Sequence, residues 1–149
     1  GLVTAMDAGV TDAYKFELRA DANIQTSDGV SDENTGVSLF TETLVVALKK
    51  QDAATGVQVN LFQKGLHYII GRSRNGDYQL MGSLDGARVT ASNISSGGAR
   101  SDFNGYNLTF TAQEVSPANF VQSDATDANF PVSELGLAGT ITIGTPVAV

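Results

Sequence analysis

The sequence predicts a mainly β domain with one short α-helix. Two segments, Ala13–Arg19 and Tyr106–Gln113, alternate strictly between apolar and polar side chains, as half-buried strands require. A third segment carries the pair Asn75-Gly76 between two apolar runs, which is typical of a β-hairpin. The chain has 149 residues and 42% apolar content, which suits one globular domain with one core.

The first strand is predicted over Ala13–Arg19, with Tyr14, Phe16 and Leu18 on the core side. The stretch that follows, residues 21–37, is polar and rich in Asp, Asn and Gly. We therefore expect a long polar loop or an irregular hairpin there. Loops of this length in compact domains are usually functional or disordered.

The second strand is predicted over Ser38–Leu48. Its apolar side chains fall on one face, and only Glu42 interrupts that face. These apolar side chains are those of Phe40, Leu44, Val46 and Leu48.

A helix is predicted from Asp52, a good N-cap residue, to about Gln63. Within it, Ala54, Val57 and Leu61 have the i, i+3, i+7 spacing of a buried stripe. One glycine and two valines lower the helix propensity of this segment. Packing against the rest of the domain must therefore stabilise the helix.

The hairpin is predicted to pair Leu66–Ser73 with Tyr78–Gly82 around the turn Arg74–Asp77. We expect Asn75 and Gly76 to supply the two positive φ angles of a type I′ turn.

Later strands are predicted over Ala87–Ser92 and Tyr106–Gln113, with a flexible tip at Ser95–Gly98 between them. A last strand is expected over Gly139–Thr145, stopped by Pro146 because proline cannot donate to a ladder.

We expect a single domain over residues 1–149. Its core is predicted over residues 13–115, because the regular alternation is confined to this part. The pattern weakens after Pro117, so residues 116–149 are predicted to form a C-terminal arm or an edge strand.

The formal net charge is −7, and it is unevenly distributed. Residues 1–44 hold two basic and eight acidic residues, whereas residues 45–105 hold seven basic and four acidic ones. Acidic arms of one subunit could therefore pair with basic faces of the next. The alternative is that both are ordinary solvated faces. The acidic balance opposes binding to a nucleic-acid backbone.

The chain offers little for catalysis. It has one histidine, His67, and no cysteine, and it lacks the motifs of serine hydrolases, zinc proteases and nucleotide-binding loops. We therefore expect a protein that is not an enzyme and uses no cofactor. The acidic segment Asp28–Asn34 offers oxygen ligands without the spacing of a twelve-residue calcium loop, so no metal is expected. No apolar run approaches the roughly 20 residues of a membrane span.

Four stretches of the central block carry a resemblance. They read FTETL at residues 40–44, LKKQD at 48–52, RNGDYQLMG at 74–82 and NGYNLTFTAQE at 104–114. In their order along the chain, they resemble small phage virion proteins, and tail-tube-like subunits in particular.

This resemblance implies a β-sandwich or partial barrel with one flanking α-helix. It also implies self-assembly into hexameric rings that stack into a tail tube, with other virion proteins as further partners and assembly in the host cytoplasm. Genome DNA would pass through the lumen without specific binding. Residues 21–37 and the C-terminal arm are candidates for ring-to-ring contacts. The candidate interface side chains are those of Asp28, Asp32, Glu33, Lys49, Lys50, Arg72, Arg74 and Arg88.

Two other functions remain open from the sequence. The first is another part of the virion, namely a head-tail connector, a tail terminator or a capsid decoration protein, since these can share a fold and differ in symmetry. The second is a secreted β-sandwich that binds a glycan or a protein through its loops. Sugar binding usually uses exposed aromatic side chains, and this chain has no Trp and only four Tyr.

Overall fold

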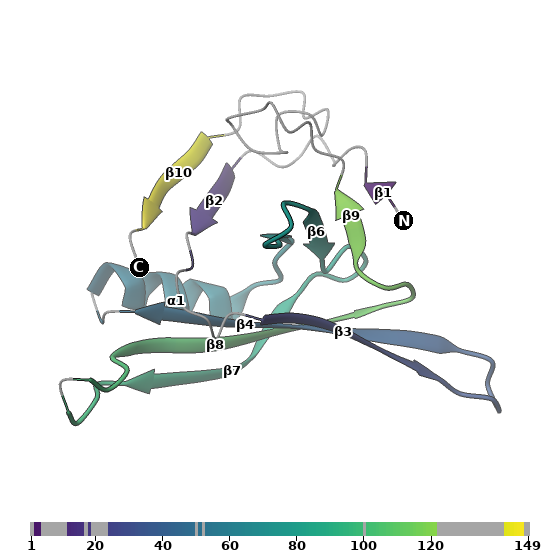
Figure 1. Cartoon of the computed structure of the whole chain (residues 1–149), viewed down its shortest axis with the longest axis horizontal. Helices are drawn as coiled ribbons and strands as arrows, with labels where there is room; N and C mark the ends of the chain where they lie inside the picture. Colours follow the sequence, from purple (N-terminus) through teal and green to yellow (C-terminus); the bar gives the residue numbers. More distant parts are fainter. Residues whose placement is uncertain are drawn as a thin grey trace.

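The computed structural model describes residues 2–3, 12–16, 18, 24–49, 51, 53–99, 101–121 and 142–147. In this part of the chain the fold is mainly β with one helix, as predicted. A four-stranded main sheet has the order β3-β4-β8-β7, a second four-stranded sheet has the order β1-β9-β6-β5, and β2 pairs with β10. The helix, the second sheet and the β2–β10 pair all lie on one side of the main sheet (Figure 1). These described strands form two layers and no closed barrel.

The main sheet consists of β3 (Ile24–Ser31), β4 (Ser38–Lys49), β8 (Gly105–Glu114) and β7 (Arg88–Ser95), all antiparallel to their neighbours. The strands predicted over Ser38–Leu48 and Tyr106–Gln113 are thus confirmed as β4 and β8. β7 begins one residue later than predicted and extends three residues further, to Ser95.

The polar stretch 21–37 contains a regular strand and the turn of a β-hairpin, so the expected long loop was wrong and the alternative, a hairpin, is present but regular. β3 pairs with β4 over eight consecutive positions, from Ile24 opposite Val45 to Ser31 opposite Ser38. Only one side chain of β3 is even partly buried. A strand exposed on both faces has no apolar alternation, which is why the sequence pattern did not reveal it.

The helix α1 (Ala53–Lys64) lies within one residue of its predicted bounds, but its predicted buried stripe was wrong. Val57 is 63% exposed and Leu61 62% exposed, whereas Thr55 and Val59 are buried and Phe62 is partly buried. The helix therefore packs with the face that has i, i+4, i+7 spacing from Thr55. The predicted cap Asp52 and the side chain of Ala54 lie outside the described part.

The second sheet contains β5 (Ile69–Arg72), β6 (Tyr78–Met81), β9 (Asn119–Val121) and the parallel β1 (Leu2–Val3). The predicted hairpin is confirmed as β5–β6. Leu80 of β6 and Val121 of β9 form a small second core.

The turn of this hairpin differs from the predicted type I′ turn. The N–H of Gly76 donates to the carbonyl oxygen of Ser73 (3.1 Å), and the N–H of Ser73 donates to that of Asp77 (2.8 Å). These two bonds close a three-residue loop, Arg74–Gly76, in which Gly76 takes the left-handed conformation with φ of 96°. This is the common three-residue hairpin, a turn followed by a left-handed glycine.

A separate pair is formed by β2 (Asp12–Phe16) and β10 (Thr142–Val147), which run parallel. β2 ends before the predicted bound at Arg19, and Leu18, predicted to face the core, is exposed. β10 continues past Pro146, where the register shifts, so the predicted stop at this proline was wrong.

The main hydrophobic core lies between α1 and the covered face of the main sheet. β4 and β8 supply most of it through alternate residues that face each other, such as Val46 opposite Leu108 and Leu48 opposite Tyr106. The buried members are Val46, Leu48, Val59, Met81, Ala87, Tyr106, Leu108, Phe110 and Ala112.

Candidate assembly surfaces

One face of the main sheet has no described element packed on it, because α1 and the other strands all lie on the opposite side (Figure 1). The strand register shows which side chains point to this uncovered face. It is rich in hydroxyl and amide groups and carries few charges. Its hydroxyl and amide members are Thr26, Thr41, Thr43, Thr90, Asn93, Ser95, Asn107, Thr109, Thr111 and Gln113.

A β-bulge breaks the regular pairing of β7 with β8 on this face. The register shifts between Val89 and Ala91, so that Thr90 is the extra residue. The Thr90 hydroxyl lies 2.8 Å from the Thr111 hydroxyl and 3.3 Å from the carbonyl oxygen of Thr109. These bonds fix the bulge in place.

The main sheet has two free edges among the described residues. β3 pairs only with β4, and β7 pairs only with β8. The free edge of β7 begins after Ala87, whose N–H and carbonyl oxygen are both bonded to His67, at 2.7 and 2.8 Å. Unpaired strand edges of this kind are templates for another strand.

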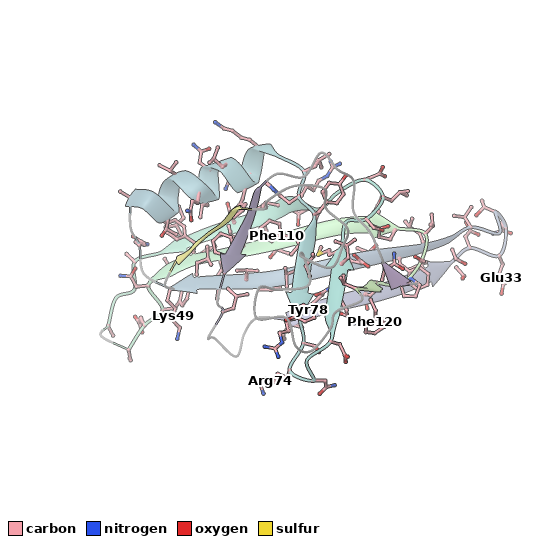
Figure 2. The ribbon with its side chains drawn as sticks, turned by 90° about the horizontal axis from the view of Figure 1, so that it is seen from above. Glu33, Lys49, Arg74, Tyr78, Phe110 and Phe120 are labelled. Atoms are coloured by element: carbon pink, nitrogen blue, oxygen red, sulfur yellow. The ribbon has the colours of Figure 1, made fainter. Side chains whose placement is uncertain are left out.

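The predicted interface residues are spread over the molecule. The acidic Asp28 lies on β3, and Asp32 and Glu33 follow it in the turn to β4, all exposed. Lys49 ends β4 at the opposite end of the main sheet from Glu33 (Figure 2). The acidic residues of β3 and its turn therefore do not meet Lys49 within one copy.

The arginines lie in two places. Arg72 and Arg74 belong to the β5–β6 hairpin, where the Arg72 guanidinium lies 5.7 Å from the centre of the Tyr78 ring. Arg88 begins β7, on the free edge opposite to β3. Lys50 lies outside the described residues.

The β3–β4 turn holds Asp32 in its charged form. The Asn34 backbone N–H donates to Asp32 Oδ1 at 2.8 Å, and this bond lowers the pKa of the Asp32 carboxyl below its ordinary value. The N–H of Asp32 donates to the carbonyl oxygen of Val37, and Gly36 takes the left-handed conformation with φ of 66°. The turn thus presents a fixed carboxylate at the end of β3.

A second group of acids was not recognised from the sequence. Glu42 on β4 and Glu114 on β8 are 1% and 4% exposed on the covered face. The Glu114 carboxylate accepts hydrogen bonds from the Ser83 hydroxyl (2.9 Å) and the Leu84 N–H (3.1 Å), and Glu42 accepts one from the Gly82 N–H (3.4 Å). The two acids therefore hold the loop that leads from β6 to β7.

Burial raises the pKa of Glu42, and the nearby charge of Glu114 raises it further, while the Gly82 N–H acts in the opposite direction. The sequence marked Glu42 only as an interruption of an apolar face. The Gly82 N–H that donates to Glu42 lies 40 positions further along the chain, so no local pattern could reveal this hydrogen bond.

His67 has a structural place. Its Nε2 lies 2.9 Å from the carbonyl oxygen of Phe62, so the tautomer with its proton on Nε2 donates to the last turn of α1. Its ring packs edge-on against the rings of Phe62 and Phe110, at centroid distances of 5.4 and 6.2 Å. This histidine therefore joins the end of α1 to β8 and, through its backbone, to Ala87.

Within the described ranges, no group of three or more His, Cys, Asp or Glu side chains is arranged to hold a metal ion. The described helix is also too short and too polar to cross a membrane.

No protein-family model and no curated protein matches the chain. A chain in a solved structure described as the virion of a native gene transfer agent particle is similar to 68% of this chain, over 80% of its own length. The identity is 10% and the TM-score is 0.29. A similarity of this size does not identify the fold or the function.

Proposed function

We propose that this chain is a structural subunit of a phage-like virion, in which copies join into rings through the free edges of the main sheet and the rings stack into a tail tube. The observation that carries the proposal is the pair of free edges, β3 and β7, on opposite sides of one sheet. The sequence resemblance to tail-tube-like subunits supports the position in the virion. In this proposal the protein has no catalytic role.

The direction of the strands suits a ring. The four strands of the main sheet alternate in direction, so β3 and β7 run antiparallel to each other. A copy that is rotated about a ring axis can therefore add its β3 to the β7 of its neighbour as another antiparallel pair. Closing the ring removes both free edges at once.

The offset between the edges also suits a closed barrel. Ser31 of β3 lies opposite Ser38, at one end of β4. Ser95 of β7 lies opposite Gly105 of β8, which in turn lies opposite Lys49 at the other end of β4. Edge pairing therefore shifts each copy along the strands by about four to six residues. With about 3.3 Å per residue and about 4.8 Å between strands, this shift over four strands tilts them by roughly 35–45°. Known barrels have strand tilts of about 35–45°.

The uncovered face would line the lumen of such a ring, with α1 on the outside. It offers hydroxyl and amide groups and, as charged side chains, Asp28, Lys49 and Arg88 on the strands, with Asp32 directly after the end of β3. Mixed charges on a mainly neutral face give no continuous basic track for a phosphate backbone. DNA would pass along this lining without specific binding.

The test is to examine the purified full chain by electron microscopy and sedimentation. We expect rings or tubes of uniform diameter. A species that remains monomeric at high concentration would overturn the proposal. Stacked tubes indicate a tail tube, whereas single rings that never stack indicate a connector or a terminator.

A matched pair of variants tests the role of the edge. Ala91→Lys places a charge on the free edge strand β7, whereas Thr109→Lys places the same charge at the same level of the same face on the central strand β8. We expect Ala91→Lys to abolish assembly and Thr109→Lys to retain it, because a lysine on an edge strand opposes the addition of another strand. The reverse result would show that assembly does not use this edge.

A further inference from the structure

The ring proposed above leaves the register between neighbouring copies undetermined. Two features limit this register. Side chains alternate between the two faces of a sheet, so a shift of one residue would exchange the faces, and only registers that differ by two residues are permitted. We call the shift of one copy along the strands, relative to its neighbour, the offset. An offset of four or six residues keeps the faces matched and gives a strand tilt of about 35° or about 45°.

The ends of the edges give a second limit. β3 ends at Ser31, where the turn closes through the bond from the Asp32 N–H to the carbonyl oxygen of Val37. The open edge of β7 begins at Arg88, because Ala87 is already bonded to His67. An offset of six residues places these two ends side by side. An offset of four would place Ser31 opposite Ala87, whose backbone N–H and carbonyl oxygen are already bonded to His67.

The chemistry of the facing pairs on the uncovered face separates the two registers. Thr90 is the extra residue of the bulge and is left out of the pairing. With an offset of six, a hydroxyl of one copy then faces a hydroxyl of the next, a carboxylate faces an amide, an apolar side chain faces an apolar one, and a second carboxylate faces a guanidinium. These facing pairs are Thr26 with Ser95, Asp28 with Asn93, Val30 with Ala91, and Asp32 with Arg88. With an offset of four, Asp28 would face Ala91 and Val30 would face Arg88. Complementary cross-strand pairs are the ones that stabilise a sheet.

We propose that neighbouring copies pair β3 with β7 at an offset of six residues, so that Asp32 of one copy forms an ion pair with Arg88 of the next. Both side chains are exposed in the single copy. Within one copy β3 and β7 are three strand spacings apart, roughly 14 Å, so these two residues do not meet there. The ion pair therefore exists only between copies.

The geometry of Asp32 supports this partner. One carboxylate oxygen, Oδ1, accepts the Asn34 N–H, which fixes the carboxylate at the end of β3. The same bond keeps the pKa of the group low, so it is charged at neutral pH. A guanidinium opposite would then face a charged carboxylate that Asn34 and Thr35 of the turn hold in place.

Cysteine cross-linking tests the register directly, because the chain contains no cysteine. Val30→Cys with Ala91→Cys reports an offset of six, and Asp28→Cys with Ala91→Cys reports an offset of four. All three positions are exposed on edge strands. Neither pair can close within one copy, since a disulfide needs Cα atoms within about 7 Å.

After mild oxidation of the assembled chain, we expect the Val30–Ala91 variant to give a ladder of covalent oligomers on a denaturing gel, and the Asp28–Ala91 variant to remain mainly monomeric. A ladder from the second variant instead, or from neither, would overturn the register even if rings form. Absence of rings in the wild-type chain would overturn the proposed function as well, so electron microscopy of the same samples separates the two failures.

Charge exchange gives an independent readout. Asp32→Arg should raise the concentration needed for half-assembly by about tenfold or more, because it sets two like charges against each other. The double variant Asp32→Arg with Arg88→Asp should restore assembly. Glu33→Arg makes the same change of charge one position away and is expected to have little effect. Equal effects of the two single variants, or no rescue by the double variant, would contradict the ion pair.

Discussion

The covered face of the main sheet is buried in two different ways. Under α1 it is apolar, with residues such as Leu48 and Leu108 packed against Val59. Under the loop from β6 to β7 it carries Glu42 and Glu114, and the backbone and side-chain donors of that loop satisfy these acids. The first region is stabilised by removal of apolar surface from water, which does not depend on pH. The second contains Glu42, whose pKa is raised by burial, so its stability responds to pH.

The largest expected effect lies in the apolar region. Leu108 is 1% exposed in the centre of the core. Leu108→Ala should lower the free energy of unfolding by about 2–5 kcal/mol, since it removes buried methyl groups and leaves a cavity. Urea denaturation followed by circular dichroism measures this. Leu61→Ala on the exposed side of α1 is the control, with an expected change within about 0.5 kcal/mol. Equal losses would mean that α1 packs with its other face.

The loop of the polar region gives the next effect. Gly82 has φ of 79°, and a Cβ there would lie 2.5 Å from the backbone nitrogen of Ala87. Gly82→Ala should therefore cost about 2 kcal/mol or more, because backbone atoms must move. Gly76→Ala is the matched control: its φ is 96°, but a Cβ meets no atom within 4 Å, so only the conformational cost of about 1–2 kcal/mol applies. Thermal unfolding of both variants compares them, and a smaller loss for Gly82→Ala would contradict the close packing of this loop.

The pH dependence of the polar region provides a third test. The pKa of Glu42 is raised above 4.5 in the folded protein, so its contribution to stability is fully present below that value and is lost as pH rises through the folded-state pKa. Glu42→Gln removes the buried charge and keeps an oxygen for the Gly82 N–H. We expect this variant to be more stable than the wild type at pH 7, and the difference to shrink as pH falls through the folded-state pKa and to be smallest at and below about 4.5.

Urea midpoints measured from pH 3.5 to pH 8 show this difference. Asp85→Asn, on the exposed part of the same loop, is the control and should change stability by no more than about 0.5 kcal/mol. If Glu42→Gln were less stable than the wild type at neutral pH, the buried charge would be a stabilising partner of the loop.

The smallest effect is expected at His67, which joins the two regions through Phe62, Phe110 and Ala87. His67→Phe keeps an aromatic ring in the cluster and removes the bond to the Phe62 carbonyl. We expect a loss of about 0.5–1.5 kcal/mol. The same urea assay measures it. His67→Ala, which also removes the ring packing, should cost more, and equal costs would show that the hydrogen bond alone matters.

The burial of each element explains what the sequence could predict. β4 and β8 were found because one of their faces is apolar and alternates with a polar one. β3 was missed because both of its faces are exposed, and the apolar pair Val57 and Leu61 suggested the wrong face of α1 because these residues point to solvent. The parallel pairings of β1 with β9 and of β2 with β10 join distant parts of the chain and leave no local signal.

The candidate interface was predicted by charge alone. The structure places Asp32 and Arg88 on the two free edges of one sheet, a relation that depends on the order of four strands and cannot be obtained from spacing along the chain. Their meeting between copies remains a prediction.

The composition of β3 has a consequence for the unassembled chain. Segments that stack into amyloid fibrils are usually apolar, uncharged and poor in glycine. β3 has an aspartate and a glycine, Asp28 and Gly29, at its centre, and polar residues on both faces. We therefore expect β3 to remain unpaired in a concentrated solution of subunits without starting fibrils. Its open edge then stays free to pair with β7 of another copy.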